Sequence, residues 1–169
     1  MNLIRFFVFT ALLVVNQFVI ALESDADQAV YIDSNTASYD DKKGLSIYTG
    51  KVVTVQGSLR IKSDKLVVHI KDGEIEKMVF TGKPTRFRQQ VGEGKEELFG
   101  EALTGEYYPK KDKLVLIEQA IVSQGSKSTK SKLIVYDSRS SIIKAGEPSS
   151  DGKRVTTVFK PSAKNKSKQ

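Results

Sequence analysis

Only a few residues of this 169-residue chain have side chains and spacings that could support catalysis or metal binding. His69 is the single histidine, a side chain that serves as a general base or a metal ligand. Asp33 and Asp64 occupy matching positions of a repeated pattern and could supply carboxylates for metal binding or acid–base chemistry. The segment Gly92-Glu93-Gly94 contains the paired glycines that a phosphate-binding loop requires.

None of these candidates has the neighbouring residues that its chemistry would require. His69 falls on the polar face of an alternating segment and no motif places a nucleophile beside it, so we interpret it as a surface histidine. One aspartate per repeat is weak evidence for a site, and the glycine pair does not continue into a dinucleotide fingerprint. The chain has no cysteine, which excludes disulfides, thiolate metal sites and cysteine nucleophiles. We therefore predict a binding protein that is not an enzyme and that uses no cofactor or metal.

The positive charge of the chain does not by itself indicate a nucleic-acid partner. The formal net charge is +7 and the pI is about 9.5, which favours association with anions in general. Single-strand binding needs aromatic residues interleaved with basic ones, and only Arg86-Phe87-Arg88 has this pattern. We predict scattered, solvating lysines and no nucleic-acid partner.

The two ends of the chain differ in composition from the rest. Residues 1–21 have one basic residue, Arg5, then an apolar run and a cleavage-like Val19-Ile20-Ala21, which is typical of a secretory signal peptide. A permanent membrane anchor is the alternative. We predict a flexible lead-in at residues 22–28, one domain at residues 29–160 and a disordered basic tail at residues 161–169. An exported protein without disulfides is expected in a bacterial periplasm or outside the cell, and we predict the periplasm.

The domain has the two-residue alternation of antiparallel β-structure. Leu59 and Ile61 lie on one face of a predicted strand, and Arg60 and Lys62 lie on the other. Similar units begin near residues 32, 61, 99 and 129, each followed by a charged turn and a second apolar run. Spacings of roughly thirty to forty residues are typical of stacked supersecondary units that share one interior.

Segments rich in charged and turn-forming residues mark turns between these strands, and glycine-containing segments mark bends within them. Hairpin turns are predicted at residues 40–44, 71–74, 109–113 and 137–140. Bends are predicted at Thr49-Gly50-Lys51, Thr81-Gly82-Lys83-Pro84 and Gln124-Gly125-Ser126. The prediction is an all-β, elongated, twisted jelly roll of stacked antiparallel hairpins that is open at both ends.

Several segments in this order resemble the OstA-like domain family. They are Gly50–Ile61, Asp64–Val68, Gly82-Lys83-Pro84-Thr85-Arg86-Phe87, Gly100–Tyr107 and Gly152–Val158. The resemblance covers Asp27 to about Ser162. It implies a periplasmic carrier that binds lipopolysaccharide acyl chains in an apolar groove. It also implies head-to-tail self-association and pairing with an inner-membrane component of the same fold and with an outer-membrane translocon of the lipopolysaccharide transport system.

The resemblance also indicates which residues meet lipid and partners. Phe87 and Tyr107 are the first candidates for acyl-chain contact, and Ile32, Ile61 and Phe99 are further ones. The first edge strand is expected to include Val30 and Ile32. The last edge strand is expected to include Val155, Thr157 and Phe159. The alternatives that stay open are an OstA-like protein-interaction module without a lipid ligand and an anchored partner of the same system.

Overall fold

The computed structural model describes residues 25–92, 94–146 and 154–161, and they form one ten-stranded antiparallel sheet. Its strands are β1 (Val30–Asp33), β2 (Thr36–Asp40), β3 (Leu45–Gln56), β4 (Leu59–Lys71), β5 (Glu74–Gln89), β6 (Leu98–Tyr108), β7 (Lys113–Gln124), β8 (Lys127–Asp137), β9 (Ile142–Ala145) and β10 (Thr156–Phe159). The predicted all-β fold of stacked hairpins is confirmed. The predicted signal peptide and residues 162–169 of the predicted tail lie outside the described residues.

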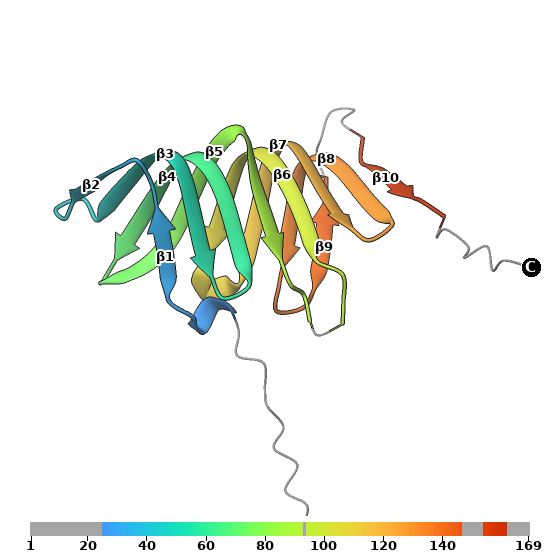
Figure 1. Cartoon of the computed structure of the whole chain (residues 1–169), viewed down its shortest axis with the longest axis horizontal. Coiled ribbons are helices and arrows are strands. Elements are labelled where there is room, and N and C mark those ends of the chain that lie inside the picture. The colour runs from blue at the N-terminus through green and yellow to red at the C-terminus, as the bar shows by residue number, and fades with distance from the viewer. Residues whose placement is uncertain (1–24, 93, 147–153, 162–169) are drawn as a thin grey trace, which may run out of the picture.

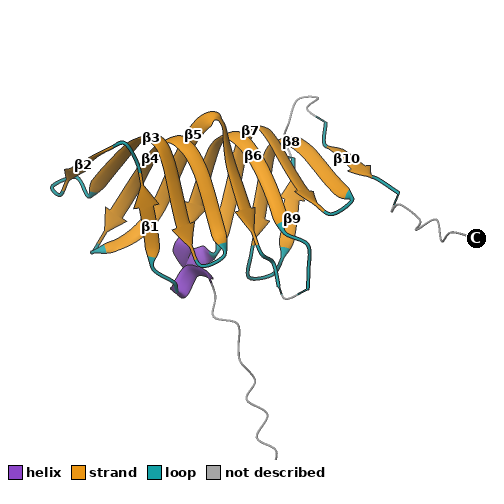
Figure 2. Cartoon of the chain, in the orientation of Figure 1, coloured by secondary structure: helices purple, strands orange, loops and turns teal. Residues whose placement is uncertain are grey.

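The strands lie side by side along the long axis of the molecule in chain order (Figure 1). The path is β1-β3-β4-β5-β6-β7-β8-β10, with β2 also paired to β3 and β9 also paired to β8. Apart from the strands, the described residues contain two short 3-10 turns, η1 (Asp25–Asp27) and η2 (Pro109–Lys111), which Figure 2 shows in purple. Within these same residues, no helix is long and apolar enough to span a membrane.

Each long strand is interrupted near its middle, where the pairing register shifts. These bulges divide the sheet into two halves that enclose one core. Half-sheet A consists of β2, β9 and residues 45–49, 65–71, 74–81, 104–108, 113–117 and 133–137. Half-sheet B consists of β1, β10 and residues 52–56, 59–63, 85–89, 98–102, 120–124 and 127–131.

Two of the three predicted bends are confirmed. The register shifts between Thr49 and Val52 in β3, and between Thr81 and Thr85 in β5, where the Lys83–Pro84 peptide is cis. The third prediction is wrong, because residues 125–126 form the hairpin turn between β7 and β8. The bend of β7 lies instead at Glu118 and Gln119, which adopt positive φ angles of 63° and 54°. A glycine search misses this bend because no glycine is present there.

The core follows from the alternation of apolar residues along each strand. Leu59 and Ile61 are buried, and Arg60 and Lys62 face outward, as predicted. The most completely buried side chains come from both halves and from most of the long strands: Val52, Leu66, Met78, Phe80, Leu98, Leu116 and Ile134. The core therefore runs along the stack of strands as one continuous interior.

The predicted flexible lead-in differs from the structure between Asp25 and Gln28. The Asp25 carboxylate accepts hydrogen bonds from the Ser58 amide, the Ser58 hydroxyl and the Gln89 side-chain amide, each at 2.6 Å. The side-chain amide of Gln56 donates to the carbonyl oxygens of Ala26 and Gln28, both at 3.0 Å. These bonds attach the lead-in to half-sheet B, and no local sequence pattern indicates them because the partners are more than 25 positions away.

Candidate functional site

The candidate site is the interior between the two half-sheets, and three predicted lipid contacts lie in it. Phe87 on β5, Tyr107 on β6 and Ile61 on β4 are 3–4% exposed and belong to the core. Ile32 on β1 is half-buried and packs against the same core. The structure thus places four of the five candidates in the core or against it, and their contact with lipid stays a prediction.

Phe99 does not line this interior. Its neighbours Leu98 and Gly100 occupy the inward positions of β6, so that the alternation directs Phe99 outward, where its side chain is 47% exposed. The expected position of Phe99 in an apolar groove is therefore wrong, because its side chain lies on the outer surface. The alternation of Phe99 with Leu98 indicates an outward side chain, whereas the prediction for Phe99 rested on its position in the family resemblance.

The first end of the interior is bounded by an edge made of two short strands. β1 pairs with residues 53–56 of β3 and β2 pairs with residues 45–49. Tyr39 on β2 and Tyr48 on β3 make a T-shaped ring contact at 6.0 Å between centroids, and Tyr39 is 66% exposed. Val30 and Ile32 lie on β1 as predicted, whereas the contribution of β2 and of Tyr39 was not anticipated. Tyr39 lies next to a charged turn, and nothing in its local pattern indicates a sheet edge.

The last end is bounded in the same way by β9 and β10, which both pair with β8. Thr157 and Phe159 lie on β10, and Val155 precedes its first residue by one position. The four side chains of β10 are exposed, and that of Phe159 is 71% exposed. An exposed strand with apolar side chains at the end of a sheet is a ready surface for pairing with another chain.

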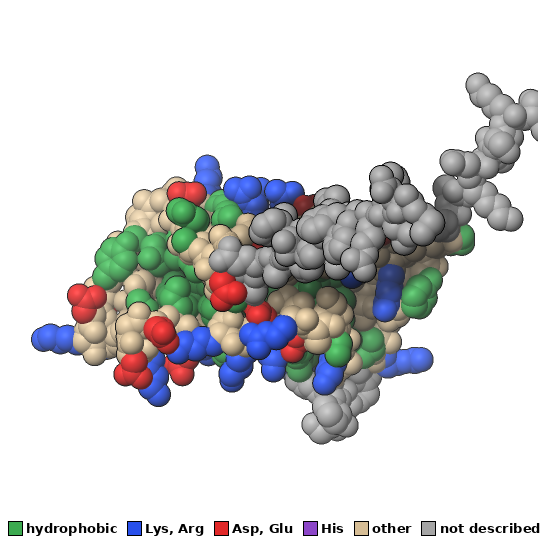
Figure 3. All heavy atoms as spheres, turned by 90° about the horizontal axis from the view of Figure 1, so that it is seen from below, with side chains coloured by type: hydrophobic (Ala, Val, Ile, Leu, Met, Phe, Trp, Pro, Cys, Tyr) green, Lys and Arg blue, Asp and Glu red, His purple; other side chains and the backbone are tan. Residues whose placement is uncertain are grey.

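A slit separates the two half-sheets on the side where the hairpin turns lie. Lip A is formed by residues 41–44, 72–73, 109–112 and 138–141, and lip B by residues 57–58, 90–92, 94–97 and 125–126. Seen from below, hydrophobic side chains of the described residues gather between borders of charged side chains (Figure 3). The attached lead-in lies in this slit.

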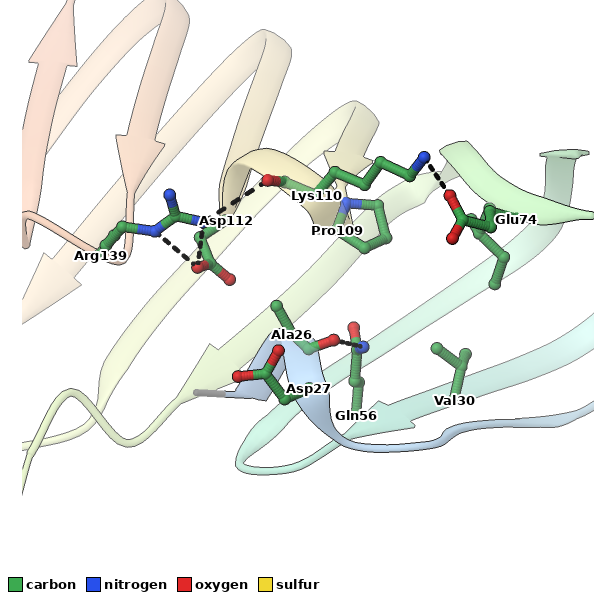
Figure 4. Close-up of a pocket in the computed structure, with 10 residues that line it drawn as sticks. Ala26, Asp27, Val30, Gln56, Glu74, Pro109, Lys110, Asp112 and Arg139 are labelled. Atoms are coloured by element: carbon green, nitrogen blue, oxygen red, sulfur yellow. Dashed lines mark hydrogen bonds and ion pairs between the residues drawn. The ribbon is translucent and has the colours of Figure 1, made fainter. Parts of the chain in front are cut away.

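A cavity of about 570 Å³ lies between the lead-in and lip A. Ala26, Asp27 and Gln56 line one side, and Pro109, Lys110, Asp112 and Arg139 line the other (Figure 4). The Asp112 carboxylate has a side-chain exposure of only 5% and accepts hydrogen bonds from Arg139 Nε at 3.1 Å and Nη2 at 3.0 Å. The Ser138 amide donates to the carbonyl oxygen of Asp112 at 2.9 Å, so that two turns of lip A are held together.

Two tyrosine side chains lie beneath this slit. Burial raises the pKa of Tyr107, and the Asp112 and Asp25 carboxylates raise it further. Burial likewise raises the pKa of Tyr136 to about 12, with added contributions from Asp25, Asp137 and Asp112. Both phenols are therefore neutral at physiological pH and present an aromatic surface to the interior.

The interior of half-sheet B is less apolar than that of half-sheet A. Its buried polar side chains are Thr54, Gln56, Ser63, Thr85, Gln89, Thr129 and Ser131. Thr85 donates to the carbonyl oxygen of Lys62, whereas the hydroxyls of Thr54 and Ser63 have no hydrogen-bond partner among the described residues. Within the described part of the chain, the interior of half-sheet B thus holds unpaired polar atoms of Thr54, Gln56 and Ser63 beside its apolar side chains.

The amino-acid sequence of this chain matches known proteins over most of its length. The family model described as "LptA/(LptD N-terminal domain) LPS transport protein" matches residues 31–142. The chain is 32% identical over 151 residues to the lipopolysaccharide export system protein LptH of Pseudomonas aeruginosa, covering 86% of each chain. It is 36% identical over 144 residues to the protein LptA of Escherichia coli K12, covering 84% of this chain and 76% of LptA.

A solved structure agrees with these sequence matches. The crystal structure of LptH, the LptA-homologous periplasmic component of the lipopolysaccharide transport device of Pseudomonas aeruginosa, superposes with a TM-score of 0.76 at 30% identity. The match covers 82% of this chain and all of that one. On the matched family model and the extent of these identities, the chain belongs to the LptA/LptD N-terminal domain family of lipopolysaccharide transport proteins.

Proposed function

We propose that this protein carries lipopolysaccharide across the periplasm by holding its acyl chains between the two half-sheets. The observation that carries this proposal is the single apolar interior that continues along the stack of strands from β1 to β9. Each methylene removed from water contributes about 0.8 kcal/mol, so a chain of a dozen carbons costs about 8–10 kcal/mol to expose. A carrier therefore needs apolar surface along its whole length, and no reactive group.

Entry of acyl chains requires the slit to widen. The interior is filled by side chains such as Phe80, Leu66 and Met78, none of which exposes measurable surface. Close-packed interiors have no free volume for a lipid tail, so a tail has to separate the half-sheets or displace side chains. The bulges at mid-strand are the positions where the halves can hinge, because ladder pairing is already interrupted there.

The two edges would join this protein to its neighbours. An exposed edge offers unpaired backbone donors and acceptors, and addition of a strand from a second chain satisfies them. The first edge, with Val30 and Ile32, would receive the inner-membrane component of the same fold. The last edge, with Thr157 and Phe159, would meet another copy or the outer-membrane translocon. The result is a head-to-tail bridge in which the interiors of successive subunits are continuous.

Photocrosslinking in cells that make lipopolysaccharide tests the carrier function. A photoreactive phenylalanine analogue replaces Phe87, which faces the interior, and separately Lys42, which lies on an exposed turn. We expect a lipopolysaccharide adduct at position 87 and none at position 42. Absence of an adduct at position 87 in a folded, exported protein would favour the alternative, a protein-binding module without a lipid ligand.

Periplasmic localisation after removal of residues 1–21 is tested by the intact mass of the purified protein. We expect a mass that corresponds to a chain beginning at Leu22. A mass that includes residues 1–21 would instead indicate an anchored member of the same system. Membrane fractionation of the same cells provides the control, because a cleaved carrier is expected in the soluble periplasmic extract.

A further inference from the structure

Four basic side chains meet on the outer surface of half-sheet B. Arg60 and Lys62 lie on β4, and Arg88 and Arg86 are their respective register partners on β5. Like charges directly opposite one another on neighbouring strands destabilise a sheet. The arrangement therefore carries an electrostatic cost in the protein alone, and a bound anion would offset it.

The protein neutralises this charge only in part. Arg86 Nε lies 3.4 Å from Glu101 and Arg88 Nη1 lies 3.5 Å from Glu97, and all four side chains are at least one-third exposed. Exposed pairs of this kind contribute little stability. Arg60 Nε is buried and has no hydrogen-bond partner among the described residues. A guanidinium donor without an acceptor is costly, and an anion bound beside the accessible part of Arg60 would offset this cost through its charge.

An aromatic ring completes the concave surface formed by these cations. Phe99 pairs in register with Arg88, and a pocket of about 340 Å³ is lined by Arg60, Lys62, Arg86, Phe87, Arg88 and Phe99. Guanidinium groups match the oxygen geometry of a phosphate, and an exposed aromatic face packs against the apolar face of a sugar ring. The residues present thus fit a sugar that carries a phosphate better than they fit an isolated small anion.

This pocket lies close to the slit, on the outer side of lip B. Arg60 is the second residue of β4 after the turn at residues 57–58, Arg88 is the penultimate residue of β5, and Phe99 is the second residue of β6. A strand rises about 3.3 Å per residue, so these side chains lie only about 7 Å from lip B on its outer side. A molecule whose acyl chains pass between the lips could lay its head group over lip B onto this pocket.

We propose that Arg60, Lys62, Arg86, Arg88 and Phe99, here called the lip cluster, form a binding site for a phosphorylated sugar head group. The site lies outside the interior and holds the polar part of the ligand while the apolar part lies between the half-sheets. That the head group belongs to lipopolysaccharide rests on the proposed function. Binding of a phosphorylated sugar by the lip cluster does not depend on that function.

Nuclear magnetic resonance of the arginine Nε–H groups tests the site directly. The probes are glucosamine 1-phosphate, unphosphorylated glucosamine and inorganic phosphate, each added at low ionic strength to the mature protein. We expect saturable shifts of the Arg60 and Arg88 signals with glucosamine 1-phosphate, at least about fivefold weaker affinity for inorganic phosphate, and no shift with glucosamine. Equal affinity for both phosphate probes, or no shift with either, would overturn the proposal.

Substitutions separate the site from general charge effects. Arg88→Gln is expected to weaken glucosamine 1-phosphate binding about tenfold, as loss of one charged hydrogen-bond pair predicts. Lys65→Gln removes the same charge from β4 in half-sheet A and should leave the affinity unchanged. An equal loss in both variants would show that only net charge matters and would contradict the proposal. Arg60→Gln is the second test, and its unfolding midpoint is measured first because Arg60 is partly buried.

Intact and chemically dephosphorylated lipopolysaccharide then link the site to the carrier function. Arg88→Gln should weaken binding of the phosphorylated form and leave binding of the dephosphorylated form unchanged. If the wild-type protein binds neither form, the proposed function fails, and the glucosamine 1-phosphate titration still decides the lip cluster. If that titration shows no shift at Arg60 and Arg88 while lipopolysaccharide binds normally, the lip cluster proposal alone fails.

Discussion

The ring of Phe87 on β5 lies over the backbone of Gly100, its register partner on β6, and fills the space that a side chain at position 100 would need. A methyl group built on Gly100 would overlap the ring. The predicted lipid contact Phe87 is therefore held in place by the absence of a side chain on the neighbouring strand. Phe87 and Gly100 both belong to segments that resemble the OstA-like family, and they are 13 positions apart in the chain.

Gly100→Ala is expected to lower the free energy of unfolding by about 1–3 kcal/mol, because the added methyl group overpacks the ring of Phe87. Urea denaturation followed by circular dichroism measures the loss. Gly105→Ala is the matched control on the same strand, since its Cβ would lie 3.8 Å from Leu116 at ordinary contact distance. The control should be neutral or stabilising by up to about 1 kcal/mol. Equal losses in the two variants would contradict the contact.

The sequence predicts the strands and their facing residues better than it predicts how the strands meet. Alternation places Ile61 and Phe87 inside and Arg60 and Arg88 outside, because a period of two is a local property of each strand. The same rule places Phe99 outside, whereas its position in the family resemblance favoured the interior. Burial on a strand follows from whether a position is an odd or an even number of residues from its inward-facing neighbours, here Leu98 and Gly100.

Long-range contacts account for the features that the sequence did not indicate. The bend at Glu118 and Gln119 uses positive φ angles at non-glycine residues, which the surrounding sheet imposes. The attachment of Asp25 depends on Ser58 and Gln89, which are brought near it only when the hairpins stack. Features of this kind arise from tertiary packing, and no local pattern encodes them.

Asp25→Ala is expected to release the lead-in from lip B, because the substitution removes the acceptor of three hydrogen bonds. The Ser58 amide should lose its protection from hydrogen exchange, and the free energy of unfolding should fall by about 1–3 kcal/mol. Asp27→Ala removes the same charge from the same turn and serves as the control. Unchanged exchange at Ser58 in the Asp25 variant would show that the lead-in is held by other contacts.

Stability is expected to fall as the pH rises above about 10, because buried tyrosines keep their protons in the folded state. The folded pKa of Tyr136 is raised to about 12, whereas an unfolded tyrosine titrates near 10. The unfolded state therefore binds fewer protons between these values, and the contribution of Tyr136 is complete below pH 10 and is lost as the pH rises through 12.

Urea midpoints measured from pH 8 to pH 11.5 test this dependence. Tyr136→Phe should reduce the loss of stability above pH 10, because a phenylalanine has no proton to release. Tyr31→Phe is the control, since Tyr31 is exposed on β1. The same pH profile in wild type and in Tyr136→Phe would rule out titration of this phenol as a cause.

Thr157→Pro is expected to abolish head-to-tail association without unfolding the chain. The reason is that the backbone amide of Thr157 points away from β8 and makes no hydrogen bond within the sheet that the structure describes. The Lys160 amide donates to the carbonyl oxygen of Ser126 at 2.8 Å, next to the β8 ladder. Donors alternate sides along a strand, so the Val158 amide also faces β8, and the Thr157 amide faces away from it into the open edge.

Proline at position 157 therefore removes a donor that only a neighbouring subunit would use. Thr157→Ala is the control, since it loses the same 3.2 Å hydroxyl contact with Thr129 but keeps the amide. Light scattering at increasing protein concentration should show association for wild type and Thr157→Ala and a monomer for Thr157→Pro, with similar unfolding midpoints for both variants. Full association of a folded Thr157→Pro variant would mean that subunits do not join through β10, and the bridge would have to use another surface.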